Sequence, residues 1–233
     1  MKKFVILTMT FAFANLAHAG DNPAAKPLER DIKRHKQFLE IVKQGNPDVV
    51  FLGDSITQGW EGNGKNAWQK HFAPLKAINL GIGGDQTGHV LWRLTEGGEF
   101  ETIRPKVVVL MIGTNNTGNK EHTAERIAGA ISEIVKTIHK KSPETKVLLL
   151  AVFPRANKAG ELNTKIPEIN KIIAKLDDGG KTVKYLDIGD KFLVDGKMAK
   201  GVMYDYLHLS TRGYEIWAEA IMPTLNEMLG RKE

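Results

Sequence analysis

The sequence predicts an α/β fold in which one parallel sheet lies between two layers of helices. Short apolar segments alternate with helical patterns along the chain, which is the order that a parallel sheet requires. Two of these segments, Val107–Ile112 and Val147–Val152, are almost wholly apolar and show no polar alternation. Strands that helices cover on both faces have this composition. With 233 residues, of which 42% are hydrophobic, the chain suffices for one domain with a sizeable core.

The expected elements follow one another from residue 28 onward. Residues 28–44 have the spacing of an amphipathic helix, which Gly45-Asn46-Pro47 ends. The expected strands are Val49–Leu52, Ala77–Leu80, Val107–Ile112, Val147–Val152 and Val183–Asp187. Further helices are expected near residues 65–72, 86–95, 123–140, 165–176 and 213–229. No internal repeat or long linker interrupts this pattern, so we expect an N-terminal segment and helix over 20–46 and one domain over 47–230.

The first 19 residues have the pattern of a secretory signal peptide. Two lysines precede an apolar run over residues 4–17, and Ala17-His18-Ala19 has the small-x-small form of a cleavage site. We therefore expect an exported protein, either periplasmic or secreted. The apolar run is short for a membrane span and no second long run follows, so no stable span is expected after removal of the signal. A retained N-terminal anchor is the alternative.

Charge and composition exclude several classes of function. The net charge of +6 falls to +4 when the two lysines of the signal peptide are removed. The remaining basic residues are scattered and form no face at helical spacing, so no nucleic-acid partner is expected. The chain has no cysteine, which excludes disulfides, thiolate metal sites, cysteine nucleophiles and a lipid-modified cysteine.

Small and polar residues gather at one edge of the expected sheet. Ligands of such sheets collect outside the carboxyl ends of the strands, and functional loops lie there. The segments in question are Gly53-Asp54-Ser55, Gly81–Thr87, Gly113–Asn116, Phe153-Pro154-Arg155 and, before the last helix, Asp205–His208. We expect the functional site to be built from these five segments.

The residue types in these segments are those of a serine hydrolase. A serine hydroxyl such as that of Ser55 becomes a nucleophile when a base takes its proton, and a carboxylate improves the base by fixing its tautomer. Asp205 and His208, three residues apart, can supply this pair. Backbone N–H groups at the Gly83–Gly84 turn and at Ser55, with the amide of Asn115, are candidate oxyanion donors.

Each of these residues has a second interpretation when it is taken alone. Ser55 could cap a helix, the glycines could serve turns, and Asn115 could bond its own loop. Patterns for dinucleotide, P-loop, zinc-protease and EF-hand sites are absent, as is the GxSxG nucleophile motif. We therefore expect no metal and no organic cofactor.

Four blocks in order resemble the SGNH (GDSL-type) hydrolase family. They are GDS at 53–55, GGD at 83–85, GTNN at 113–116 and DYLH at 205–208. Longer runs are similar to the catalytic subunits of the platelet-activating factor acetylhydrolases. These runs are GIGGDQTGHVLWRL (81–94), IRPKVVVLMIGTNN (103–116) and MYDYLHLSTRGY (203–214). The resemblance covers roughly residues 47–220, nearly the whole expected domain.

The resemblance implies a fold and a role for each matching residue. The fold is a three-layer α/β/α sandwich whose five-stranded parallel sheet has the flavodoxin-like order 2-1-3-4-5. Ser55 matches the nucleophile, His208 the general base and acid, and Asp205 the residue that orients it. The oxyanion donors are Ser55 N–H, Gly84 and Asn115, and the neighbours that restrict the acyl pocket are Ile56, Thr114 and Leu207. Asp54 and Asp85 are expected to bond backbone amides and hold loops together.

The function implied is that of a serine esterase acting on short-chain esters, acetyl esters above all, of a carbohydrate or a lipid. Trp60 and Arg155 are candidates for contacting a sugar or a head group, although tryptophans more often pack in cores. The expected partner is a small-molecule or glycan ester, and relatives imply a homodimer. A lysophospholipase or thioesterase would use the same constellation of residues. A non-catalytic glycan-binding protein of this fold is the alternative outside the enzymes.

Overall fold

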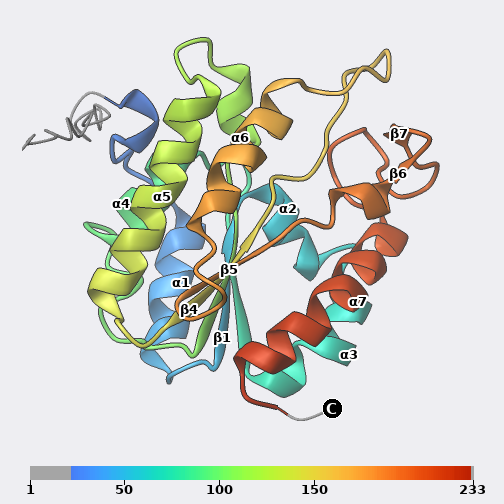
Figure 1. Ribbon diagram of the computed structural model, residues 1–233. Coiled ribbons are helices and arrows are strands. Elements are labelled where there is room, and N and C mark those ends of the chain that lie inside the picture. The colour runs from blue at the N-terminus through green and yellow to red at the C-terminus, as the bar shows by residue number, and fades with distance from the viewer. Residues whose placement is uncertain (1–21, 232–233) are drawn as a thin grey trace, which may run out of the picture.

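The protein is built around a central sheet of five parallel strands (Figure 1). The computed structural model describes residues 22–231. The strand order is β2-β1-β3-β4-β5, which confirms the predicted order 2-1-3-4-5. The strands are β1 (Val49–Gly53), β2 (Ala77–Gly81), β3 (Val107–Met111), β4 (Lys146–Leu150) and β5 (Val183–Leu186). Each strand begins within one residue of the predicted start and ends within two residues of the predicted end. The predicted signal peptide over 1–19 lies outside the described residues.

Helices cover both faces of the sheet, which confirms the three-layer arrangement (Figure 1). The helices on one face are α1 (Lys33–Lys43), α4 (Thr87–Leu94), α5 (Ala124–Lys141) and α6 (Lys165–Ile173). Those on the other face are α2 (Ser55–Gln58), α3 (Lys65–His71) and α7 (Thr211–Met228). Because a parallel strand must return to the same end of the sheet, each crossover places a helix on one of these faces.

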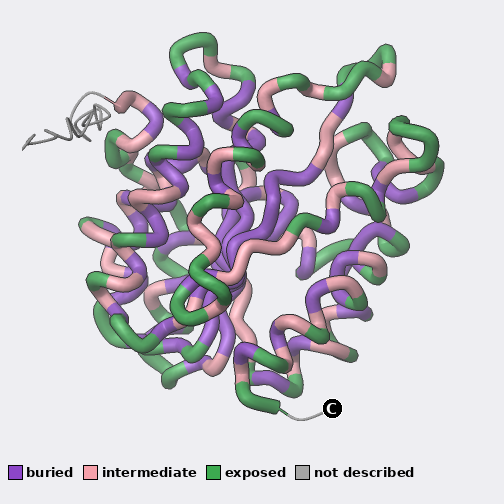
Figure 2. The backbone as a smooth tube through the Cα atoms, in the orientation of Figure 1, coloured by how far each residue is buried: buried purple, intermediate pink, exposed green. Residues whose placement is uncertain are grey.

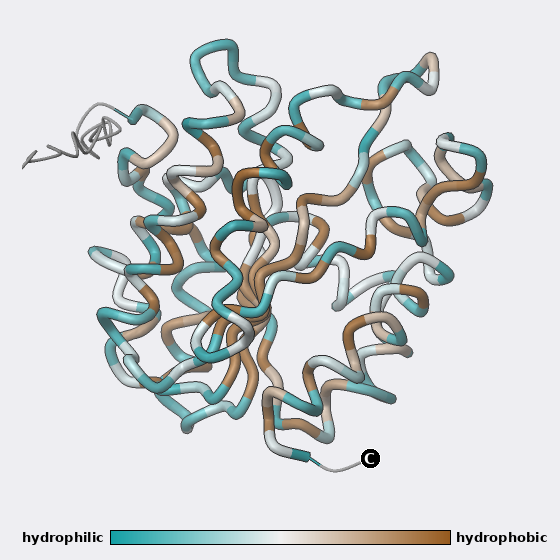
Figure 3. The backbone as a smooth tube through the Cα atoms, in the orientation of Figure 1, coloured by the Kyte–Doolittle hydropathy of each residue, from teal (hydrophilic) through white to brown (hydrophobic). Residues whose placement is uncertain are grey.

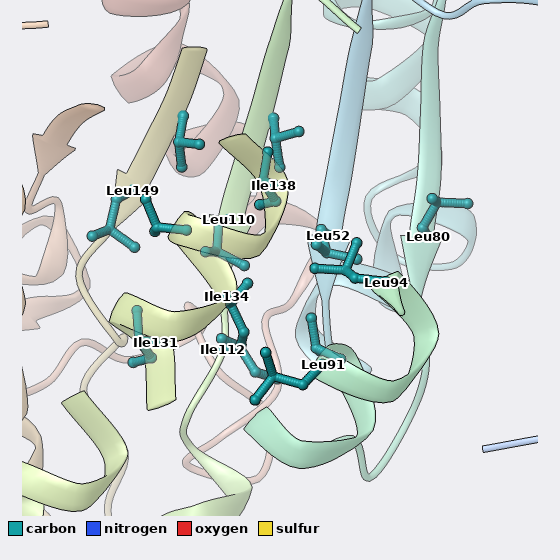
Figure 4. Packing of buried hydrophobic residues seen from close by; sticks show 14 of the residues in the cluster. Leu52, Leu80, Leu91, Leu94, Leu110, Ile112, Ile131, Ile134, Ile138 and Leu149 are labelled. Carbon is teal, nitrogen blue, oxygen red and sulfur yellow. The ribbon is translucent and has the colours of Figure 1, made fainter. Parts of the chain in front are cut away.

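Alternate residues of the strands enter two separate hydrophobic clusters. Leu52 and Leu110 pack with Ile134 of α5 on one face (Figure 4). Phe51 points to the other face, where it meets Trp217 of α7 edge-on. The middle strands are accordingly buried along almost their whole length (Figure 2), and hydrophobic residues gather there in the part of the chain that the structure describes (Figure 3). Burial on both faces is the reason why β3 and β4 show no polar alternation in the sequence.

The first helix is shorter than its sequence pattern suggests. It begins at Lys33, and Ile32 before it is extended, with φ −109° and ψ 166°. The prediction that the helix begins at residue 28 was therefore wrong. Leu28 instead donates its N–H to the Gly88 carbonyl at 3.0 Å, so the segment before α1 runs over the start of α4. This extended path brings Arg30 to the loop that follows β2.

The chain between β5 and α7 forms features that the periodicity did not predict. A two-stranded antiparallel ribbon joins β6 (Leu193–Val194) to β7 (Lys197–Met198). After it, an antiparallel bridge between Met203 and Leu209 closes a short loop, here called the His208 loop. Among residues 22–231, no helix combines the length and apolar character needed to cross a bilayer.

Candidate active site

Ser55 stands at the junction of β1 and the one-turn helix α2. Asp54, not Ser55, is the N-cap, because its Oδ1 accepts the Ile56 N–H at 2.9 Å. Ser55 is therefore free of the capping role that was its alternative interpretation. As the first residue of a helix, Ser55 has an N–H without an acceptor inside that helix. Gly53 makes the junction possible, since a Cβ there would lie 2.4 Å from the Met111 carbonyl oxygen.

His208 reaches Ser55 from the other end of the chain. Its Nε2 lies 2.9 Å from the Ser55 Oγ, and its Nδ1 lies 2.7 Å from Asp205 Oδ2. Asp205 Oδ1 also accepts the backbone N–H of His208 and, at 3.1 Å, that of Leu207. The structure thus brings together the three residues that the sequence singled out as nucleophile, base and orienting acid, although 150 residues separate Ser55 from Asp205.

The contacts of Asp205 fix the protonation pattern of this chain of groups. Partial burial alone would raise the pKa of Asp205, but its hydrogen bonds with the side chain and backbone of His208 outweigh that effect and hold the pKa below its usual value. An ionised carboxylate only accepts hydrogen bonds, so Nδ1 of His208 carries the proton. Nε2 is then left as the acceptor for the Ser55 hydroxyl, which is the arrangement that general-base catalysis requires.

Two loops next to Ser55 present candidate oxyanion donors. In the turn after β2, the Gly83 N–H donates to Gln58 Oε1 at 2.7 Å and the Asp85 N–H to the Ile82 carbonyl at 3.2 Å. Gly84 lies between them, is exposed, and has φ +80°, which favours glycine. No acceptor for the Gly84 N–H is found among residues 22–231, so it is the donor of this turn that remains for a ligand.

Asn115 ties the two loops together. Its Nδ2 donates to the Asp85 carbonyl at 2.9 Å, so the start of the turn after β3 is joined to the turn after β2. A primary amide has two N–H groups, and this bond uses one of them. The second N–H stays available on the half-buried side chain. The bond therefore holds Asn115 in place without consuming its capacity to bind a developing oxyanion.

A buried network of charges lies beneath the turn after β2. Asp85 accepts from Arg30 Nε at 2.8 Å, and Arg93 Nε lies 3.0 Å from its other oxygen. Arg93 also donates to Glu99 at 2.7 Å, and Glu99 meets His35 at 2.9 Å. Asp85, Arg93 and Glu99 are fully buried. The expectation that Asp85 bonds backbone amides is wrong: its side chain accepts a hydrogen bond from Arg30 and forms an ion pair with Arg93. Arg30 also donates to the Gly83 carbonyl at 2.7 Å.

Asp54 lies fully buried behind the nucleophile. Burial, reinforced by the nearby Asp85 carboxylate and opposed by the bond from the Ile56 N–H, raises the pKa of Asp54 to about 7. Its Oδ2 has no hydrogen-bond partner among residues 22–231, which fits a carboxyl that holds a proton near neutral pH. The expectation that Asp54 bonds a backbone amide is confirmed by its contact with Ile56.

The three residues expected to restrict the acyl pocket differ in exposure. Ile56 and Thr114 are each 1% exposed, and Ile56 belongs to the cluster that contains α3 and α7. The Tyr214 hydroxyl fixes this turn by donating to the Ile56 carbonyl at 2.6 Å. Leu207 is half-buried. Two of the three side chains are therefore enclosed by the protein, and the third is partly exposed.

The two candidate substrate contacts, Trp60 and Arg155, differ in burial. Trp60 is 1% exposed and packs against Tyr214 and Trp217 with ring centroids 4.6 and 4.7 Å away. The prediction that Trp60 contacts a ligand is wrong, because the indole is part of the core. Arg155 is half-buried and donates to the Thr114 carbonyl at 3.3 Å. It also borders a pocket of about 390 Å³ at the carboxyl ends of β4 and β5.

Sequence reasoning missed two histidine contacts. His35 is buried and pairs with Glu99, 64 residues away. No local spacing could reveal this pair. The ring of Tyr204 stacks on His208, with centroids 5.9 Å apart; its position four residues before His208 was the available signal. Within residues 22–231, no three His, Asp or Glu side chains converge as a metal site would require.

Comparison with known proteins places this geometry in context. The model of the GDSL-like Lipase/Acylhydrolase family matches residues 51–216. The chain is 39% identical over 223 residues to platelet-activating factor acetylhydrolase IB subunit alpha1 of Rattus norvegicus, covering 92% of this chain and 94% of that protein. It is also 39% identical over 208 residues to the alpha2 subunit of Gallus gallus, covering 85% and 88%.

Two solved structures share the fold at lower identity. A GDSL-like lipase from Bacteroides thetaiotaomicron has a TM-score of 0.66 and 20% identity, covering 83% of this chain and 97% of its own. A variant of an acetyl-xylooligosaccharide esterase from Geobacillus Stearmophilus has a TM-score of 0.58 and 17% identity, covering 81% and 96%. At these identities the likeness concerns the arrangement of the sheet and helices.

Proposed function

This chain belongs to the GDSL-like lipase/acylhydrolase family and is a carboxylic ester hydrolase, and from that premise we propose that it cleaves short-chain esters through an acyl-serine on Ser55. The observation that carries the proposal is the continuous line of contacts from Ser55 through His208 to Asp205. These contacts matter because each group fixes the protonation of its neighbour. The carboxylate fixes the imidazole tautomer, and the imidazole accepts the hydroxyl proton.

The reaction proceeds in two halves. His208 Nε2 takes the proton of Ser55 as Oγ attacks the ester carbonyl, and the oxyanion is bound by the N–H groups of Ser55, Gly84 and Asn115. His208 then protonates the leaving alcohol, and the acyl-serine remains. A water molecule that His208 deprotonates attacks this ester and releases the acid, which restores Ser55. Asp205 stays ionised throughout and stabilises the imidazolium that forms in each half.

The acyl group is proposed to be short, with acetyl the best fit. The resemblance places Ile56 and Thr114 at the acyl pocket, and both are 1% exposed, so we take them as fixed walls that cannot withdraw without disturbing the core. The names of the relatives, which are acetylhydrolases, support the same size. A long acyl chain would need a channel at this position.

The alcohol and the location of the protein are also part of the proposal. We take the substrate to be an O-acetyl ester of a carbohydrate or a lipid, and the protein to be exported on the strength of residues 1–19. A lysophospholipase or thioesterase would share the nucleophile and base and differ in the acyl group accepted. A non-catalytic binding protein is no longer in competition, since the family is one of hydrolases.

A chain-length series tests the proposal most directly. We expect kcat/KM for p-nitrophenyl esters to fall steeply from acetyl to octanoyl, because longer chains collide with the buried side chains beside Ser55. A preference for octanoyl would refute the short acyl pocket and favour the lysophospholipase alternative. Mass spectrometry of the protein after treatment with a fluorophosphonate should show one adduct, on Ser55, in the wild type.

The Ser55→Ala variant is the matched control for this series. It should lose ester hydrolysis and fluorophosphonate labelling while it keeps the circular dichroism spectrum and melting temperature of the wild type, because Asp54 rather than Ser55 caps α2. Removal of a serine nucleophile typically costs more than about 10⁴-fold in kcat. Turnover at the wild-type rate in this variant would assign the nucleophile to another residue.

A further inference from the structure

The ammonium group of Lys165, at the start of α6, is held by backbone carbonyls. Its Nζ donates to the carbonyl oxygens of Thr117, Asn119 and His122 at 3.2, 3.1 and 3.1 Å. An ammonium group has three N–H donors, so these three bonds occupy all of them. Lysine side chains usually extend into water, whereas Lys165 is half-buried. A half-buried charge that gives every donor to one segment calls for an explanation other than solubility.

The three carbonyls belong to the segment between β3 and α5, which also carries the proposed oxyanion donor Asn115. This segment includes the short 3-10 helix η5 (Asn115–Gly118), whose first residue is Asn115. Thr117 of η5 donates to the Thr114 carbonyl twice, through its N–H at 3.2 Å and through its hydroxyl at 2.7 Å. The bond from Lys165 to the Thr117 carbonyl therefore holds a residue that is itself bonded to the residue directly before Asn115.

A second cationic side chain holds the other end of the same turn. Arg155 donates through Nη1 to the Thr114 carbonyl at 3.3 Å. The two cations come from one segment of the chain, because the Asn163 N–H donates to the Arg155 carbonyl at 2.9 Å and Asn163 Oδ1 accepts the Lys165 N–H at 3.0 Å. Asn115 thus lies between the carbonyls that these two side chains bind.

An oxyanion donor must be held in place before the reaction begins. The bond from Asn115 Nδ2 to the Asp85 carbonyl fixes the amide, but the backbone that carries this side chain is fixed by the turn. We propose that Lys165 is a positioning residue that holds η5 so that the second N–H of Asn115 meets the developing oxyanion. Because its donors are spent on carbonyls, Lys165 acts through Asn115 and not on the substrate. The inference rests on the proposed function and adds a residue to it.

The turn has one further anchor, which does not depend on Lys165. Asn116 Oδ1 accepts the Thr87 N–H at 3.0 Å, and its Nδ2 donates to the Thr87 hydroxyl at 2.8 Å. These bonds tie η5 to the start of α4 whether or not the ammonium group is present. Removal of Lys165 should therefore shift the turn without unfolding it, and the oxyanion donor should be displaced without being lost.

A double-mutant cycle with Asn115 tests the inference. Lys165→Ala should lower kcat for p-nitrophenyl acetate about tenfold with little change in KM, a smaller loss than removal of the donor itself causes. In the Asn115→Ala background the same substitution should lower kcat less than about twofold, because the donor that Lys165 positions is already gone. Lys175→Ala is the matched control, at an exposed lysine of η6 (Ala174–Leu176), and should keep the wild-type kcat.

Chemical rescue separates positioning from a general loss of structure. Ethylammonium carries the three N–H donors that Lys165→Ala lacks, so it should restore most of the lost kcat in this variant. Tetramethylammonium has the same charge and no N–H donor, so it should restore none at the same concentration. All rates are compared at a temperature at which circular dichroism shows each variant folded. If the alanine variant does not fold, Lys165→Met, which keeps the apolar stem, takes its place in the cycle.

The outcomes separate this inference from the proposed function. A wild-type kcat in the Lys165 variant would overturn the inference and leave the Ser55 mechanism in place. So would a tenfold loss that persists in the Asn115→Ala background, since Lys165 would then act independently of the oxyanion donor. Equal rescue by the two ammonium ions would also overturn it, because charge alone would be responsible. A wild-type protein that hydrolyses no p-nitrophenyl ester would reject the proposed function, and the inference with it.

Discussion

The two halves of the candidate active site are built in opposite ways. The nucleophile side, formed by the ends of β1 and β2, lies on a fully buried network of Asp85, Arg93 and Glu99. The base side is the His208 loop, in which Tyr204 and Asp205 are exposed. The first half is part of the core of the protein, whereas the second is a surface loop closed by one bridge.

This difference matches what each half must do. Oxyanion donors work only when their N–H groups are held in place before the reaction, and the buried charges hold the turn that carries Gly84. A general base needs one fixed orientation. Asp205 provides it for His208 by contacting both the backbone N–H and Nδ1 of that residue. The base side can therefore be exposed and open to the alcohol, while the nucleophile side cannot.

The strongest test of this contrast is to break the buried network. Arg93→Met keeps the apolar stem and removes the guanidinium, which leaves Asp85 and Glu99 buried with fewer partners. We expect the free energy of unfolding to fall by about 3–5 kcal/mol, measured by urea denaturation. Lys43→Met removes an exposed partner of Glu40 and should cause no measurable change. Equal effects of the two substitutions would mean that the network adds nothing to the stability of this side.

Removing the link between the two loops of the nucleophile side comes next in size. Asn115→Ala deletes the bond to the Asp85 carbonyl and one proposed oxyanion donor. We expect kcat for p-nitrophenyl acetate to fall about 100- to 1000-fold with little change in KM, as for the loss of other oxyanion donors. Steady-state kinetics on a variant shown to melt at the wild-type temperature is the measurement. A rise in KM alone would mean that Asn115 positions the substrate instead.

The same contrast explains how much of the molecule could be predicted from its sequence. The strands were found because burial on both faces leaves an apolar run, and the site segments were found because the strand ends of a parallel sheet meet at one edge. The network beneath Gly84 was not predictable, because Arg30 reaches Asp85 across 55 residues and comes from a segment whose spacing looked helical. Trp60 was misplaced because no spacing tells which side of a single helical turn faces the core.

The buried carboxyl on the nucleophile side should make stability depend on pH. The pKa of Asp54 is raised to about 7 by burial in the folded state, against 3.8 as its ordinary value. Between these two values the folded protein holds a proton that the unfolded chain has lost. Stability from this group is therefore complete below about pH 4 and is lost as the pH rises toward 7, by up to about 1.4 kcal/mol per pH unit.

Asp54→Asn removes this titration and can keep the bond from the Ile56 N–H. We expect the wild type to lose stability relative to the variant as the pH rises from 5 to 8. Urea denaturation of both proteins at each pH measures the difference in their free energies of unfolding. Parallel curves for the two proteins would show that Asp54 stays ionised in the folded state. The pH dependence would therefore arise on the nucleophile side, where Asp54 is buried.

The smallest expected effect concerns the strained residue on the exposed side. Tyr206→Asn keeps φ +63° at lower cost, so it should raise the free energy of unfolding by about 0.5–1 kcal/mol. Lys76→Asn is the matched control, because Lys76 has φ +51° in an exposed turn before β2 and should be stabilised to a similar extent. Urea denaturation of the two variants beside the wild type is the measurement. A loss of stability in Tyr206→Asn alone would mean that contacts of the Tyr206 ring offset the strain of its backbone.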